Sequence, residues 1–150
     1  MSQARDIETA GQSFGSKIHV LPVSNEADID GAFQKIKDID AGALIVATDA
    51  FLLVQKEQIV TLGLRHAVPT IYNLREYVLS GGLLSYGTSL TDAYRQLGLY
   101  VGRVLKGENP SHLPIIQPTK FELVINRKTA AALKITISDV LIALADEVIE

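Results

Sequence analysis

Residues 42–50 read GALIVATDA, and they indicate a β-strand that is buried on both faces. The five residues 43–47 are all apolar, which is typical of a strand in a parallel sheet covered by helices. The polar pair Thr48 and Asp49 follows the strand directly. Apolar residues recur at helical spacing over residues 26–38 before this strand, and over about 52–66 after it.

The first half of the chain continues this alternation of helix and strand. A helix is predicted over residues 3–14, a short buried strand over 17–23 (KIHVLPV), and another strand over 68–72 (VPTIY), which is entered through a proline. The connections between these segments are short. Alternating helices and strands of this kind predict an α/β fold with a parallel sheet.

The second half has a different pattern. Gly81-Gly82 interrupts the chain before a short strand at 83–86, and Ser89 to Asp92 resembles a capping box. The remaining elements predicted from periodicity are an amphipathic helix over 90–106, a strand over 121–126, a short helix over 127–133 and a last helix over 139–149.

Length and composition suit one soluble domain. The 150 residues are 47% hydrophobic, enough for a substantial core, and the formal net charge of −3 gives no basic excess for nucleic acid. Cysteine is absent, which excludes disulfides and thiolate chemistry. No apolar run reaches the length of a membrane span, and the N-terminus lacks a signal-peptide pattern. A cytoplasmic location is therefore expected if the chain is expressed as it stands.

Candidate binding residues follow three of the predicted strands. Ligands of open parallel sheets bind beyond the carboxyl ends of the strands. Those ends carry Ser24-Asn25, Thr48-Asp49 and Tyr72-Asn73, with Glu76 just beyond. Such groups suit a small polar solute whose amino group pairs with Asp49.

Each of these residues also has an ordinary structural role to weigh. Ser24 and Asn25 suit helix caps, Asp49 can cap the following helix while it contacts a ligand, and Tyr72 can be an edge aromatic. Glu76 and Tyr77 are expected in solvent unless the chain folds back over the cleft.

Motifs for catalysis and cofactor binding are absent. The sequence has no glycine-rich phosphate loop and no nucleophile elbow, and His19, His66 and His112 are scattered without metal-ligand spacing. The prediction is a protein without cofactor or metal. A small α/β enzyme that uses Asp49 with His66 or Glu76 as acid and base remains an alternative.

The chain resembles a known family over nearly its whole length. Residues 81–100 (GGLLSYGTSLTDAYRQLGLY) and 118–130 (PTKFELVINRKTA) are its most specific parts. They resemble the substrate-binding proteins of ABC transporters, related to tryptophan/tyrosine-binding lipoproteins. The resemblance implies a parallel, three-layer, Rossmann-like lobe of a type I periplasmic-binding-protein fold. It assigns residues 1–80 to the second lobe, 81–113 to a hinge crossing and a first-lobe helix, and 114–150 to a return strand and C-terminal helices.

The resemblance also implies a function. Such a protein binds a small polar solute, such as an amino acid, in a cleft between lobes and delivers it to a permease. The full-length member is periplasmic. Thr48-Asp49 matches a pair that closes a second-lobe strand at the cleft, and Tyr86 to Ser89 lies where the crossing passes it. Relatives often have an Asp near Ser89, which this chain lacks.

Family members carry more sequence ahead of the helix at residues 3–14: a signal peptide, most of a first lobe and the first strand of the second lobe. We therefore expect this chain to correspond to the C-terminal half, truncated at the N-terminus. Without that central strand, two neighbours would have unpaired backbone groups. A homodimer, in which copies swap the 83–126 segment, is one expected solution. A cytoplasmic regulatory or interaction domain that dimerises is a further alternative.

Overall fold

The computed structural model describes residues 3–150. Its centre is a five-stranded sheet in the order β1-β2-β3-β4-β5. The strands are β1 (Leu44–Ile45), β2 (Thr70–Tyr72), β3 (Leu84–Thr88), β4 (Phe121–Asn126) and β5 (Glu147–Ile149). The pairs are parallel except that β4 runs antiparallel to β3. The predicted α/β class is confirmed, and the return strand makes the sheet mixed.

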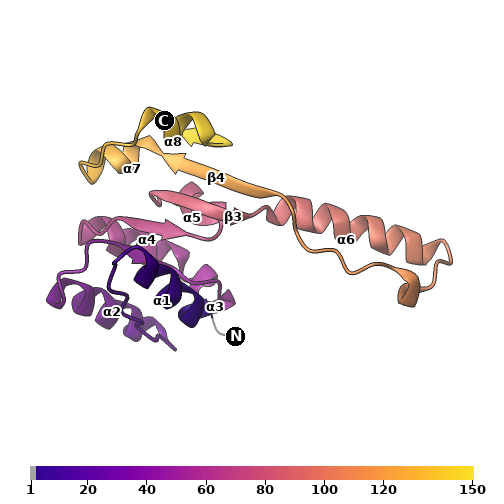
Figure 1. Ribbon diagram of the computed structural model, residues 1–150, viewed down its shortest axis with the longest axis horizontal. Helices are drawn as coiled ribbons and strands as arrows, with labels where there is room; N and C mark the ends of the chain where they lie inside the picture. Colours follow the sequence, from indigo (N-terminus) through magenta and orange to yellow (C-terminus); the bar gives the residue numbers. More distant parts are fainter. Residues whose placement is uncertain (1–2) are drawn as a thin grey trace.

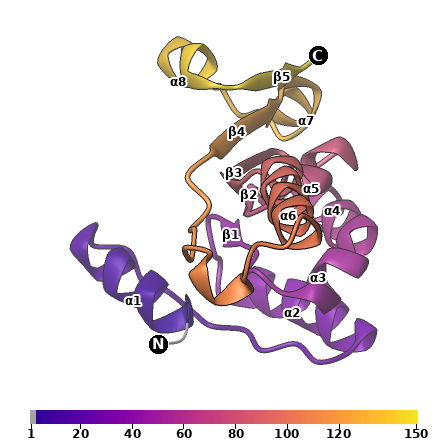
Figure 2. The ribbon, with the colours of Figure 1, turned by 90° about the vertical axis from the view of Figure 1, so that its right-hand side faces the viewer.

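The helices of the first half are α1 (Gln3–Ser13), α2 (Glu26–Asp38), α3 (Ala50–Val54), α4 (Lys56–Arg65) and α5 (Arg75–Leu79). Figure 2 shows α1 on the opposite side of β1 from α4 and α5, so helices lie on both faces of the sheet. The helix predicted over about 52–66 is divided at Gln55, which ends α3 and precedes α4.

The helices of the second half are α6 (Leu90–Leu105), a 3₁₀ turn at Pro110–His112, α7 (Arg127–Ala132) and α8 (Asp139–Leu144). Figure 1 shows α6 and the chain returning to β4 as an arm that extends away from the sheet. The helix predicted over 139–149 is wrong in its second half. The chain leaves helical geometry at Ala145 and pairs as β5 with β4, since ladder hydrogen bonds there replace a last helical turn.

The buried strand predicted over residues 17–23 is also wrong. The segment is extended, but none of its backbone groups is hydrogen-bonded to another backbone group within residues 3–150. An extended segment becomes a strand only when its backbone groups pair with a neighbour, and β1 pairs with β2 and not with this segment.

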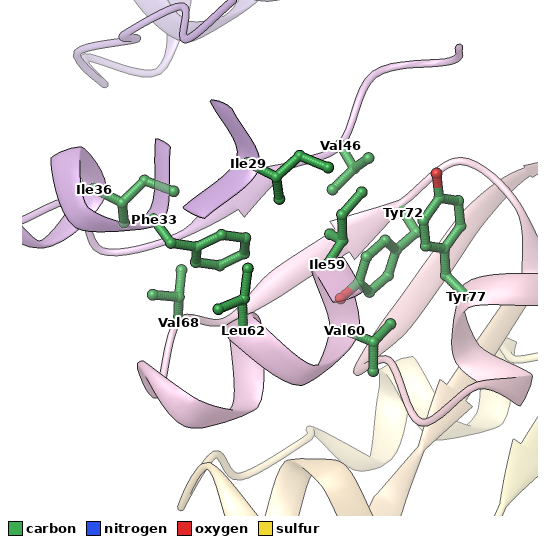
Figure 3. Close-up of a cluster of buried hydrophobic side chains, with 10 residues drawn as sticks. All are labelled: Ile29, Phe33, Ile36, Val46, Ile59, Val60, Leu62, Val68, Tyr72 and Tyr77. Atoms are coloured by element: carbon green, nitrogen blue, oxygen red, sulfur yellow. The ribbon is translucent and has the colours of Figure 1, made fainter. Parts of the chain in front are cut away.

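The core lies between α2, α4, α5 and the first two strands (Figure 3). Phe33 of α2 packs with Leu62 of α4 and with Val68 at the entry to β2. The side chains of Tyr72 and Tyr77 stack with ring centroids 4.6 Å apart. This packing holds the carboxyl ends of β1 and β2 in place.

Candidate functional site

The carboxyl ends of β1 and β2 are joined by a side-chain hydrogen bond. Thr48 follows β1, and Asn73 follows β2. The Asn73 Nδ2 group donates to the Thr48 Oγ1 atom over 2.8 Å. Because β1 and β2 are parallel, these polar side chains meet at one edge of the sheet. Asn73 lies at the strand end identified from the sequence, but only the fold shows its link to Thr48.

Gln3 is a member of this cluster that the sequence did not reveal. The Thr48 backbone N–H donates to the Gln3 Oε1 atom over 3.0 Å. Gln3 opens α1, and 45 positions separate the two residues. No local pattern signals a contact at that separation, because it depends on where α1 packs.

Asp49 combines a structural role with a free oxygen. Its Oδ1 atom caps α3 by accepting the backbone N–H groups of Phe51 at 2.8 Å and of Leu52 at 3.2 Å. Within the described residues, its Oδ2 atom accepts no hydrogen bond. Asp49 can therefore cap α3 and contact a ligand at the same time, because the cap uses one carboxylate oxygen and leaves the other for a ligand.

Two buried oxygens near this edge lack partners. The Oδ1 atom of Asn73 and the Oε2 atom of Glu76 are buried, and neither has a hydrogen-bond partner in the described part of the chain. Buried polar atoms are nearly always hydrogen-bonded, so unpaired ones are candidates for contacting a ligand. The Oγ atom of Ser85 is a third such atom.

The expectation that Glu76 and Tyr77 lie in solvent is wrong. Tyr77 is 1% exposed, and one carboxylate oxygen of Glu76 is buried. Both residues belong to α5, and they are buried because this helix packs against β2, β3 and β4. Arg75 strengthens this packing, because its guanidinium pairs with Glu122 of β4, at 3.5 Å, and with Glu147 of β5.

Tyr72 belongs to the core. Its side chain is 3% exposed and stacks on Tyr77 (Figure 3). Burial raises the pKa of Tyr72 to about 12, and the pKa of Tyr77 to about 12 as well. The charges of Tyr72 and Asp49 raise the Tyr77 pKa further. Tyr72 therefore packs in the core next to the carboxyl end of β2, and its ring does not face solvent.

Three other predicted site residues lie at helix starts: Asn25 and Ser89 are caps, whereas Ser24 precedes the cap of α2 and takes part through its backbone N–H. Asn25 forms a capping box with Asp28 at the start of α2, and the Ser24 N–H donates to the same Asp28 carboxylate. Ser89 caps α6, and its N–H donates to the Lys120 carbonyl over 3.0 Å. The predicted caps at Asn25 and Ser89 are confirmed, and Ser89 is buried.

Tyr86 lies in the crossing strand β3, with 59% of its surface exposed. Its ring stacks on that of Phe121 in the antiparallel strand β4, with centroids 5.8 Å apart. Phe121 is 49% exposed and was not predicted as a site residue. The cross-strand pair forms an accessible aromatic surface near the point where the chain leaves the sheet.

The proposed catalytic pair of Asp49 and His66 is not assembled. His66 ends α4 at the amino end of β2, where its ring stacks on Phe33, with centroids 5.8 Å apart. Asp49 lies beyond the carboxyl end of the parallel strand β1. The two residues thus occupy opposite edges of the sheet. In residues 3–150, no group of three or more His, Asp or Glu side chains could hold a metal ion.

Comparisons with known proteins give a consistent result. The family model for ABC transporter substrate binding proteins matches residues 1–149. No curated protein sequence matches significantly. Among solved structures, a conserved domain protein from Vibrio cholerae superposes with a TM-score of 0.86 at 23% identity, over 96% of this chain and 48% of that one.

Two further structures agree. An ABC domain from Streptococcus pneumonia in complex with L-Trp has a TM-score of 0.86 at 23% identity, over 98% of this chain and 51% of that one. A substrate binding protein with adhesive properties from Clostridium difficile, in a ligand-free open form, has a TM-score of 0.68 at 16% identity, over 99% and 49%. The chain spans about half the length of these structures.

Proposed function

This chain belongs to the family of ABC transporter substrate-binding proteins, and from that premise we propose that it forms one lobe of a receptor for a small polar solute. The family is non-enzymatic. The solute binds where the carboxyl ends of β1 and β2 present Thr48, Asp49 and Asn73. The other lobe, the first of the longer protein, corresponds to the half of the structural neighbours that this chain does not span, and it closes the cleft.

The observation that best supports this site is that the two oxygens of the Asp49 carboxylate have different roles: Oδ1 caps α3, and Oδ2 accepts no hydrogen bond within the described residues. The oxygen that caps α3 is held in place by two backbone N–H groups, so the other is fixed in position before any ligand arrives. An oriented carboxylate suits an ammonium group. The unpaired Asn73 Oδ1 atom is a second acceptor at the same edge. We therefore propose an amino acid or a similarly small amine as the solute.

The exposed pair of Tyr86 and Phe121 supports a solute that carries a planar ring. Aromatic rings stack in offset geometry on such surfaces, and a stacked pair contributes about 0.5–1.5 kcal/mol beyond its buried area. The L-Trp bound to the Streptococcus pneumonia domain is an example of an aromatic solute in a similar fold. With Tyr72 in the core, Tyr86 is the predicted aromatic residue that remains accessible.

The proposed partner of the longer protein is an ABC transporter permease, and its proposed location is the periplasm or the outer cell surface, where this family acts. None of the helices in residues 3–150 has both the length and the apolar character needed to cross a bilayer.

We expect Asp49→Asn to weaken amino acid binding about 10- to 100-fold, since a hydrogen bond to a charged group contributes about 1.5–3 kcal/mol. Asparagine is also a good N-cap, so α3 should remain folded. The measurement is a titration with the twenty amino acids, followed through the NMR shifts of the Thr48, Asp49 and Asn73 amides. This method detects the weak binding expected of half a cleft.

Asp139→Asn is the matched control, because Asp139 lies in the first turn of α8, far from the edge, and its Oδ atoms cap nothing. This variant should bind as the unmodified chain does. If no amino acid moves the three edge amides, or if Asp49→Asn leaves the affinity unchanged, the proposed solute class is wrong.

The arm formed by α6 supports a second proposal, self-association. None of the 16 residues of α6 is buried, although the helix is strongly amphipathic. Its exposed apolar side chains are Tyr94, Leu97, Leu99, Val101, Val104 and Leu105. An unpartnered apolar face of this size favours association. We propose that two copies cover these faces by exchanging their 83–126 arms.

Light scattering during size exclusion should give twice the monomer mass of 16.3 kDa. Leu97→Glu in the exposed face of α6 should return the protein to a monomer, because it places a charge in the interface. Leu144→Glu on α8 is the control, since Leu144 is also exposed (68%, against 56% for Leu97) but lies outside the arm. A monomer for the unmodified chain at all concentrations refutes the dimer.

A further inference from the structure

Three helices begin at the carboxyl edge of the sheet, where the proposed solute binds. Helices α3, α5 and α6 follow the parallel strands β1, β2 and β3, and Figure 1 shows α6 starting directly after β3. The start of a helix attracts anions, because its first backbone N–H groups lack partners. In this chain the three starts already carry acidic residues: Asp49 at α3, Glu76 at α5 and Asp92 at α6. A carboxylate on the solute would therefore meet a like charge at each of them.

The backbone donors beside Asp49 are also in use. Its Oδ1 atom accepts the N–H groups of Phe51 and Leu52 over 2.8 and 3.2 Å. The Thr48 N–H, one position before Asp49, donates to the Gln3 Oε1 atom over 3.0 Å. A carboxylate needs donors of this kind, whereas an ammonium group needs acceptors. The end of β1 therefore suits the ammonium group of a solute better than its carboxylate.

One arginine lies at this edge, and carboxylates of the chain already neutralise it. Arg75 is the only lysine or arginine among residues 66–94. Its guanidinium pairs with two carboxylates, those of Glu122 in β4, at 3.5 Å, and of Glu147 in β5. Arg75 therefore leaves no net positive charge with which a carboxylate of the solute could pair.

Two carboxylates of the edge, in contrast, have no cationic partner. Asp92 pairs with Arg95 at 2.9 Å. Within residues 3–150, however, neither Asp49 nor Glu76 forms an ion pair. The Oε2 atom of Glu76 and the Oδ1 atom of Asn73 are also buried without a hydrogen-bond partner in the described part of the chain. Such acceptors favour a ligand that brings donors, and an ammonium group brings three N–H donors with a positive charge.

The aromatic pair of Tyr86 and Phe121 lies beside the same edge. In the register of β2 and β3, Tyr72 lies opposite Ser85. The next residues along these two parallel strands are Asn73 and Tyr86, which are therefore neighbours on one face of the sheet. A ring stacked on Tyr86 and an ammonium group at Asn73 can thus belong to one small molecule.

We propose that this edge selects a cationic amine over a zwitterion, and that the solute is an arylalkylamine without a carboxylate. The proposal rests on the proposed function, because it specifies the solute of the same site. The ammonium group donates to the Asp49 Oδ2 atom and the Asn73 Oδ1 atom, and the Glu76 carboxylate adds attraction. The ring stacks on the pair of Tyr86 and Phe121. A zwitterion binds less tightly, because Asp49 and Glu76 repel its carboxylate.

The test compares four small molecules that share an indole ring and differ in charge. Tryptamine and L-tryptophanamide are cations in slightly acidic buffer, L-tryptophan is a zwitterion, and indole-3-propionate is an anion. Binding is followed through the NMR shifts of the Thr48, Asp49 and Asn73 amides. We expect both cations to bind at least about tenfold more tightly than L-tryptophan, because they lack the repelled carboxylate. L-tryptophanamide keeps the carbon skeleton of L-tryptophan, so it separates the effect of charge from that of size.

Glu76→Gln tests the second carboxylate. The substitution removes one negative charge and changes the size of the side chain little, so the fold should persist. The ratio of the L-tryptophan Kd to the tryptamine Kd should fall about threefold or more, since one source of repulsion is lost. Asp139→Asn is the matched control, because it removes one charge from α8, away from the edge, and should leave this ratio unchanged. Added salt should lower the ratio in the unmodified chain, because it screens the charges.

The outcomes separate this proposal from the proposed function. If L-tryptophan binds as tightly as tryptamine, or more tightly, the selection of a cation is overturned, while the receptor for an amino acid remains supported. Binding of indole-3-propionate at these amides would also overturn the selection, because the edge would then accept a carboxylate. If none of the four molecules moves the amides, the proposed site is wrong and the selection falls with it. An unchanged ratio in Glu76→Gln refutes the contribution of Glu76.

Discussion

Replacing Gly87 with alanine is expected to destabilise the protein by about 3 kcal/mol or more, at the upper end for overpacking substitutions. A Cβ atom at this position would lie 1.9 Å from the backbone oxygen of Asn73. Backbone atoms cannot move aside by changing a rotamer, so β3 and the end of β2 would have to separate. Urea unfolding followed by circular dichroism measures the loss.

The same substitution at Gly98 provides the control. A Cβ atom added there meets nothing within 4 Å, and Gly98 lies inside α6. Gly98→Ala should therefore raise the stability of the helix by up to about 1 kcal/mol, through helix propensity alone. If Gly87→Ala is as mild as Gly98→Ala, the close approach of β3 to Asn73 is wrong. Because Asn73 bonds to Thr48, Gly87→Ala should also disturb the proposed solute site.

Tyr77→Ala is expected to cost about 3–5 kcal/mol, the range found for removing a large aromatic side chain from a core. Tyr77 is 1% exposed, and its ring stacks on Tyr72. Its removal would leave a cavity under the joined ends of β1 and β2. The measurement is the midpoint of urea unfolding at neutral pH.

Tyr77→Phe is the matched control, because it keeps the stacked ring and should cost little. It also gives a test at high pH. The pKa of Tyr77 is raised to about 12 in the folded state, from an ordinary value near 10. This contribution to stability is complete below about pH 10 and is lost as the pH rises toward 12. Tyr77→Phe should therefore lose less stability between these values. Equal losses would mean that the phenol is not buried.

The sequence predicted much of the local structure. Helix α2 has the predicted bounds, and Asn25, Asp49 and Ser89 act as caps. These features depend on residues within four positions of one another, whose preferences are the same in any surroundings. The prediction of a strand over 17–23 was wrong because strand formation depends on distant residues. Its apolar pattern was correct, but a strand needs hydrogen-bond partners from distant sequence.

The candidate site also combines features that depend on neighbouring residues with features that depend on distant ones. Thr48 and Asp49 are candidates from the sequence, because polar residues that follow a buried strand are visible there. Gln3 was not found, since its contact with Thr48 spans 45 positions. The burial of Tyr77 and Glu76 was missed because it arises only when their own helix, α5, packs against β3 and β4.

Short-range patterns in this chain thus determined its class, most of its helices and the polar residues that follow its strands. Only the tertiary structure decided that Tyr72 supports the core, that Asn73 links two strands and that Arg75 pairs with β4 and β5. Periodicity and capping depend on neighbouring residues, so they are the same whatever tertiary structure the chain forms. Burial and strand pairing depend on which distant segments are present to pack, and that is settled only when the whole sheet assembles.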